Sequence, residues 1–157
     1  MGYSNRTCGL HLKRNGEEKR MDSNCGFCNY DKQYLLEETE LSIAMSFPTV
    51  LKVGHFVIAS KKHCSTFLEL EEEQIYDMLC LSQKIGKKVK KIIGCERFYI
   101  ASICDNGNHF HIHFIPKMTE DPKLGGYLFT DQGWKGELEN VATVQDIQKF
   151  IDLYREK

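Results

Sequence analysis

The sequence has no long hydrophobic run and no excess of charge of either sign. None of its apolar stretches approaches the roughly 18 residues that a membrane span needs, so no membrane partner is expected. Lys and Arg number 21 against 22 for Asp and Glu, a formal net charge of -1. The chain thus lacks the basic excess that drives binding to a nucleic-acid backbone by counterion release, so no nucleic-acid partner is expected. The N-terminus has no apolar signal-peptide core, so a cytoplasmic protein is expected.

The chain also lacks the even set of cysteines that a disulfide framework needs. It has 7 cysteines and no secretory signal, and closely spaced cysteines in a reducing compartment are more often metal ligands. Cys25 and Cys28 have the two-residue gap that lets both thiolates reach one tetrahedral zinc ion. A tight turn without a metal is the alternative for this pair.

No repeat, low-complexity segment or second domain is visible in the 157 residues. A content of 41% hydrophobic and 27% charged residues is typical of a globular chain, and the length fits one domain over residues 1–157. Residues 1–23 are polar and of mixed charge, so we expect them to form an N-terminal arm.

Short segments rich in β-forming residues predict the strands of this domain. We expect strands over residues 34–39, 41–47, 54–60, 97–103 and 109–115. The last two are joined by Asp105-Asn106-Gly107-Asn108, a tight-turn signal that predicts an antiparallel hairpin.

A long helix is expected between the third and fourth of these strands. Glutamates cluster between residues 69 and 73 and lysines between 84 and 91, an order that suits the helix dipole. Apolar residues between them recur at helical spacing, so one face should pack on a sheet. Gly94 is expected to end this helix, and Thr143 to cap a last one. The pattern predicts an α+β domain with a mostly antiparallel sheet.

The most informative segment is His109-Phe110-His111-Ile112-His113. Strand alternation would put the three histidines on one face and the apolar residues on the other, toward the core. Neighbouring imidazoles repel one another when protonated, so we expect their pKa values to be lowered and coupled. A nucleophile or a metal ligand must be a neutral imidazole. From the residues alone, a chance row of histidines and one metal bound by all three are the alternatives.

Together with two upstream motifs, this row resembles the histidine-triad (HIT) family. The motifs are Gly54-His55-Phe56-Val57-Ile58, which follows Pro48, and Lys61-Lys62-His63. Cys25-Gly26-Phe27-Cys28 resembles the family's zinc-binding branch, which is related to galactose-1-phosphate uridylyltransferases. The resemblance covers a core of residues 25–118 and leaves 119–157 as a C-terminal extension with a terminal helix. It implies a five-stranded, mostly antiparallel sheet with one long helix, and a homodimer.

The resemblance also implies a role for each histidine of the candidate active site. His111 would attack the α-phosphorus of a nucleotide and form a nucleotidyl-histidine intermediate, which splits one hard displacement into two easier ones. His113 would lie by the phosphates and the leaving group. His55 would help to orient the site from the neighbouring strand.

Zinc would bind at a separate site and take no part in the reaction at the α-phosphorus. The resemblance supplies His63 and His109 as the ligands that join Cys25 and Cys28, which leaves no open position and makes the zinc structural. Cys64 follows His63 directly, but strand alternation is expected to point its thiol away from the ion.

The sequence departs from the family where substrate is held. The family often carries Gly-Gln-Ser/Thr before the triad, with side chains that touch the phosphates, and here Asp105-Asn106-Gly107-Asn108 stands in that place. Asn106 or Asn108 would substitute for this segment. Ser46 is the nearest candidate for the ribose-binding residue.

The favoured hypothesis is therefore a hydrolase or transferase that cleaves a dinucleoside polyphosphate or a nucleoside phosphoramidate, with a purine nucleotide as substrate. The missing phosphate-binding segment motivates a second hypothesis, a non-catalytic nucleotide- or partner-binding module with structural zinc. A metalloenzyme with zinc on all three triad histidines is the third.

Overall fold

The computed structural model describes residues 25–48, 52–104, 108–121 and 142–157. The expected arm over 1–23, the candidate residue Asn106 and much of the 119–157 extension lie outside these ranges. Within them, no helix is long and apolar enough to cross a membrane.

Five strands form one sheet in the order β1-β2-β3-β5-β4, and every neighbouring pair is antiparallel. The strands are β1 (Leu35–Glu38), β2 (Ser42–Met45), β3 (Phe56–Ser60), β4 (Arg97–Ala101) and β5 (His111–Lys117). The helices are η1 (Lys32–Tyr34), η2 (Phe67–Glu69), α1 (Glu72–Ile93) and α3 (Val144–Glu156). This arrangement confirms the predicted α+β fold with one long helix and a C-terminal helix.

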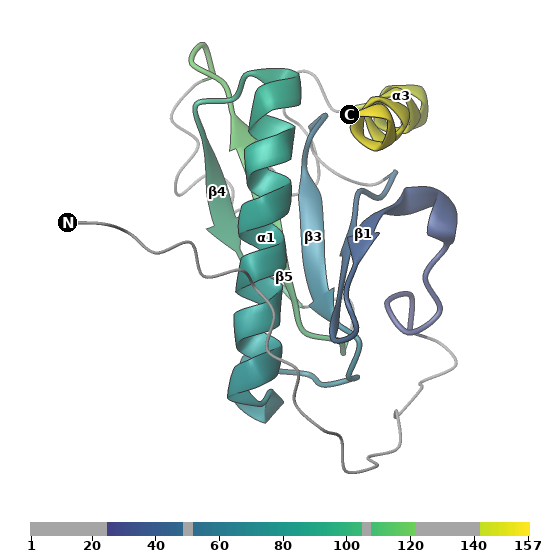
Figure 1. The fold of residues 1–157 in the computed structure, drawn as a ribbon, viewed down its shortest axis with the longest axis vertical. Coiled ribbons are helices and arrows are strands. Elements are labelled where there is room, and N and C mark those ends of the chain that lie inside the picture. Colours follow the sequence, from purple (N-terminus) through teal and green to yellow (C-terminus); the bar gives the residue numbers. More distant parts are fainter. Residues whose placement is uncertain (1–24, 49–51, 105–107, 122–141) are drawn as a thin grey trace, which may run out of the picture.

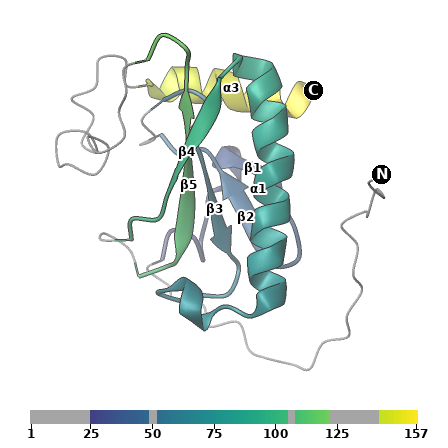
Figure 2. The same ribbon diagram turned by 90° about the vertical axis from the view of Figure 1, so that its left-hand side faces the viewer.

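Helix α1 runs along one face of the sheet, as Figures 1 and 2 show from two sides. At its start the side chain of Gln74 accepts a hydrogen bond from the backbone N–H of Glu71. The helix ends at Gly94, which takes the left-handed conformation with φ 73°, so the predicted stop is confirmed. Glycine adopts this conformation without the steric cost that a Cβ brings.

The two faces of the sheet belong to two different apolar clusters. Phe56 and Ile58 of β3 face α1 and pack with its buried residues, such as Ile85. Val57 and Ala59 point to the other face and pack with Ile43 and Met45 of β2, whose neighbours include Phe27 and Tyr30. Because side chains alternate along a strand, β5 presents Phe114 to the helix side and its histidines to the opposite face.

Helix α3 lies on the same side of the sheet as α1, near β1, and contacts both of these elements (Figure 1). The Thr143 hydroxyl accepts a hydrogen bond from the backbone N–H of Asp146, which confirms the predicted cap. Four buried residues of α3 join the main core: Ile147, Phe150, Ile151 and Tyr154. The Tyr154 hydroxyl also donates to the Glu37 carboxylate of β1.

The predicted hairpin forms, but its strands pair over a different range at the turn end. Strand β4 stops at Ala101, opposite His113, and β5 starts only at His111. Beyond that pair, the Ser102 hydroxyl donates to the His111 carbonyl (2.8 Å) in place of a ladder bond. His109 therefore precedes the strand and is free of the strict alternation that the sequence pattern assumed.

Candidate active site and metal-binding cluster

His111 opens β5 and is held by its own chain. Its Nδ1 lies 2.8 Å from the backbone carbonyl of His109. A carbonyl oxygen can only accept, so Nδ1 carries the ring proton and donates it. The other ring nitrogen, Nε2, is then left with a free electron pair. Such a neutral imidazole with a fixed tautomer is suited to nucleophilic attack.

A second pair of histidines adjoins His111. His113 lies one pleat further along β5, with its ring centroid 4.7 Å from that of His111. On its other side, His113 Nδ1 lies 3.1 Å from Nε2 of His55, a residue just before β3 that is only 2% exposed. In the sheet register, His111 faces Ala59 and His113 faces Val57 of β3. These apolar partners leave the row of imidazoles without a neighbouring charge on that strand.

The pKa values in this row are lowered, as the sequence predicts, but mainly because the rings are buried. Burial lowers the pKa of His113 to about 3, with the charge on His111 as the smaller cause. Burial also holds the pKa of His55 well below its usual range, and His113 and His111 lower it further. The pKa of His111 is lowered by burial, against the opposing hydrogen bond to the His109 carbonyl. These imidazoles are therefore neutral at pH 7.

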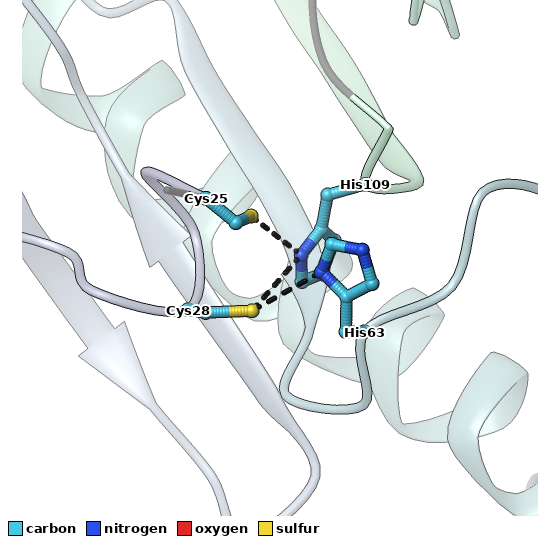
Figure 3. A group of neighbouring side chains, drawn as sticks. All are labelled: Cys25, Cys28, His63 and His109. Carbon is cyan, nitrogen blue, oxygen red and sulfur yellow. Dashed lines mark hydrogen bonds between the residues drawn. The ribbon is translucent and has the colours of Figure 1, made fainter. Parts of the chain in front are cut away.

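Four other side chains meet at the end of the sheet where β5 begins (Figure 3). Cys25 and Cys28 come from one turn, His63 from the loop after β3, and His109 from the residues before β5. Cys25 Sγ and His109 Nδ1 are 3.2 Å apart, and Cys28 Sγ lies 3.2 Å from His63 Nδ1 and 3.7 Å from His109 Nδ1. All four ligand atoms lie within 4.8 Å of one another.

The donor set suits zinc, and the three close contacts of 3.2, 3.2 and 3.7 Å are near the spacing that a zinc site needs, whereas the cluster as a whole extends to 4.8 Å and would contract around an ion. In a tetrahedral Cys₂His₂ site with metal–ligand distances of about 2.0 to 2.3 Å, ligand atoms lie about 3.3 to 3.8 Å apart. His109 is also prepared for this role, because its Nε2 lies 2.8 Å from the Ser60 carbonyl and must donate to it. The proton is thereby fixed on Nε2, and Nδ1 is left bare toward the cysteines. Outer hydrogen bonds of this kind orient histidine ligands in metal sites.

Comparison with known proteins shows which family the chain belongs to. No family model matches the chain. It is 34% identical over 112 residues to the adenosine 5'-monophosphoramidase of Schizosaccharomyces pombe, which covers 64% of this chain and 80% of that protein. An uncharacterized HIT-like protein of Saccharolobus solfataricus is 25% identical over 109 residues, covering 64% of this chain and 78% of that one.

A Zn-bound histidine triad family protein from Mycobacterium smegmatis shares the fold, with a TM-score of 0.65 at 17% identity over 85% of this chain and 91% of that one. The chain belongs to the histidine-triad family. The resemblance inferred from the sequence is thus confirmed at the level of family and fold. The roles of single residues in this histidine-triad protein stay predictions.

The predicted nucleotide-binding residues of this histidine-triad protein lie in three different settings. Asn108 is exposed beside the start of β5. Ser46 is fully buried after β2, and its hydroxyl donates to the His55 carbonyl (2.9 Å). In this arrangement the Ser46 side chain holds the backbone of His55 and has no exposed surface with which to contact a ribose. Asn106 lies outside the described residues.

Sequence reasoning missed several residues that contact the triad. The Phe27 ring, from the turn between the two cysteines, lies against His111, and the Ser102 hydroxyl binds its carbonyl. Cys104 Sγ lies 3.8 Å from His111 Nδ1. Phe27 carried a signal that could have been used, because any residue between two metal ligands must lie near the metal. Cys64 packs into the core, as predicted, away from the cluster.

Proposed function

We propose that this protein is a nucleotide hydrolase that cleaves its substrate at the α-phosphorus, with His111 as the nucleophile. The hydrogen bond from His111 Nδ1 to the His109 carbonyl carries this proposal, because it leaves Nε2 unprotonated in a ring that burial keeps neutral. The monophosphoramidase activity named for the Schizosaccharomyces pombe relative is in keeping with it.

In the proposed reaction, the electron pair on His111 Nε2 forms a bond to the α-phosphorus. The bond from phosphorus to the leaving amine or phosphate breaks, and the leaving group departs with its electron pair and takes up a proton from solvent, which regains one when water attacks in the second step. A water molecule then attacks the phosphorus of the nucleotidyl-histidine, releases the nucleoside monophosphate and restores the free imidazole. Another acceptor in place of water would make the protein a transferase.

His113 and His55 would support the substrate without acting as acids. With a pKa of about 3, His113 is neutral at pH 7 and can only share hydrogen bonds with the phosphates or the leaving group. His55 would hold the His113 ring through the 3.1 Å contact between Nε2 and Nδ1. Oriented neutral donors of this kind stabilise charge that develops in a transition state.

Cys25, Cys28, His63 and His109 would hold one zinc ion. With four protein ligands the ion would be structural, joining the N-terminal turn, the loop after β3 and the start of β5. His111 and His113 are not members of this cluster, which disfavours a metalloenzyme with zinc on the whole triad.

A purine nucleoside phosphoramidate is the substrate that the relatives favour, and a dinucleoside polyphosphate is the alternative. The test is release of nucleoside monophosphate from a panel of both classes, with adenosine and guanosine forms. We expect turnover by the wild type and by a matched His11→Ala control, and none by His111→Ala. Turnover retained in His111→Ala would refute the proposed nucleophile.

The burial of Ser46 and the absence of the Gly-Gln-Ser/Thr segment favour a second candidate, a non-catalytic module that binds a nucleotide or a partner. This candidate predicts a saturable nucleotide affinity, measured by calorimetry, with no monophosphate released from any member of the panel.

We further propose a homodimer formed through the β4 edge of the sheet and the adjoining α1. Strand β4 is an edge strand, and its Ile100 is 65% exposed. An open strand edge with an exposed apolar side chain favours pairing with another chain. The mass in solution, measured by light scattering, tests this assembly, and a monomer across the micromolar range would refute it.

A further inference from the structure

Phe27 links the metal-binding cluster to the candidate nucleophile. It lies between Cys25 and Cys28, and its ring centroid is 4.6 Å from that of His111 at an interplanar angle of 34°. The same ring lies 5.3 Å from the ligand His109. Phe47 packs edge-on against the Phe27 ring, with centroids 5.5 Å apart at 78°. Phe27 therefore touches both functional centres at once.

The turn that carries Phe27 is held by its own backbone, by the packing of Phe27 on the apolar cluster of β2 and β3, and by its two thiols. The backbone N–H groups of Cys28 and Asn29 both donate to the Cys25 carbonyl, at 3.1 and 3.0 Å, and close the turn on itself. The Cys25 and Cys28 thiols are what connect it to the loop after β3 and to the start of β5. Tetrahedral coordination would fix the positions of both thiols, and hence the direction of the ring between them.

Four groups contact the His111 imidazole, and two of them, the His109 carbonyl and the Phe27 ring, come from segments that carry the cluster ligands. Cys104 is another, with its Sγ 3.8 Å from Nδ1. The carbonyl of the ligand His109 holds Nδ1, and Phe27 covers one side of the ring. The third neighbour, His113, meets the ring edge-on at 66°. A nucleophile must be aligned closely with the phosphorus it attacks. If the imidazole ring tilts freely, the rate of the chemical step falls even when the substrate still binds.

We propose that Phe27 is a positioning residue that transmits metal binding to the nucleophile. When the four ligands close around zinc, the turn presses the Phe27 ring against His111 and holds its Nε2 in the direction of attack. Without the metal the turn loosens and the ring of His111 regains freedom. The reaction would thus depend on a metal ion that never touches the substrate. This inference rests on the proposed role of His111 as the nucleophile.

The first test follows the His111 ring directly by NMR of protein labelled with ¹⁵N-histidine, loaded with Zn²⁺ and then stripped by a chelator. Its signals are assigned by their loss in His111→Gln. We expect metal removal to broaden or shift the His111 signals in the wild type and much less in Phe27→Leu, which lacks the aromatic ring. Phe27→Tyr, which keeps the ring, should behave as the wild type. His111 signals that do not respond to metal in the wild type would overturn the proposal.

The second test measures turnover. Loss of alignment of this kind costs up to about a hundredfold in rate, and we expect Phe27→Leu to lower kcat about tenfold with KM little changed. Cys28→Ser should lower kcat as well, but should add little further loss in the Phe27→Leu background, because coupled residues are not additive. Phe67→Leu is the matched control, because the Phe67 ring is 53% exposed and lies against Phe110, and its kcat should stay near that of the wild type.

The outcomes separate this inference from the proposed function. Independent, multiplicative losses in kcat for Phe27→Leu and Cys28→Ser would refute the coupling. A rise in KM alone in Phe27→Leu would make Phe27 a substrate contact and refute its positioning role. A wild type without turnover would refute the proposed function, while the metal response of the His111 signals would still decide whether the coupling exists.

Discussion

The burial of His113 predicts that the protein loses stability as the pH falls below neutrality. The pKa of this histidine is lowered from 6.5 to about 3 in the folded protein, mainly by desolvation. In the unfolded chain it takes up a proton near its ordinary pKa, so below that value the unfolded state binds more protons than the folded state. By linkage, stability then rises with pH. The contribution of His113 is complete above pH 6.5 and declines as the pH falls from there toward 3.

The size of the effect follows from the two pKa values. At about pH 5, protonation of one histidine in the unfolded chain alone lowers the free energy of unfolding by about 2 kcal/mol. His55 adds to this loss in the same direction, because burial also lowers its pKa. A loss of this size is a large part of the stability of an ordinary domain.

Urea unfolding at a series of pH values measures this loss in the wild type and in His113→Gln, both saturated with zinc so that the metal ligands contribute equally. Between about pH 6 and pH 5 the wild type should lose about 1.4 kcal/mol more per pH unit than the variant, the value for one proton. Parallel curves for the two proteins would mean that His113 titrates alike in both states, and would refute the burial argument.

Two further predictions concern stability. Cys28→Ser should lower both the bound zinc, measured by metal analysis, and the melting temperature of the loaded protein, whereas Cys80→Ser on α1 should change neither; equal melting temperatures for Cys28→Ser and the wild type with zinc would contradict a structural metal. Gly54→Ala should cost about 1 to 2 kcal/mol in urea unfolding because φ is +83°, and its Cβ would lie 2.5 Å from Ile93 Cδ1. Gly26→Ala, with no atom within 4 Å of its Cβ, is the matched control, and an equal loss there would contradict this reason.

Periodic patterns explain how much of the fold could be predicted. The strands and α1 follow from alternation and helical spacing, and Gly94 and Thr143 mark ends whose local chemistry is read without knowledge of the tertiary structure. The Cys25–Cys28 spacing likewise predicts a pair of thiols that face one point. These features depend on neighbours in the sequence, and the structure confirms them.

Contacts between distant segments were harder to predict. Alternation alone would have kept His109 in the row with His111 and His113, but its ring nitrogens are engaged by Ser60 on one side and by the cysteine turn on the other. Mutual repulsion was expected to lower the histidine pKa values, whereas burial beneath other segments is the larger cause. Neither effect leaves a signature in the local sequence, because each depends on how the chain folds over the strand.

His109 performs three separate tasks with three separate atoms, and this makes it a point at which they can be uncoupled by protein engineering. Nδ1 faces the cysteines, Nε2 donates to the Ser60 carbonyl, and the backbone carbonyl receives the proton of His111. A His109→Cys replacement would keep four candidate metal ligands and the backbone acceptor, while deleting the bond to Ser60 and the ring contacts with Phe27 and His63. Such a variant would show how far the alignment of β3 with the start of β5 depends on the side chain of His109, a residue that contacts both the candidate metal cluster and the candidate nucleophile.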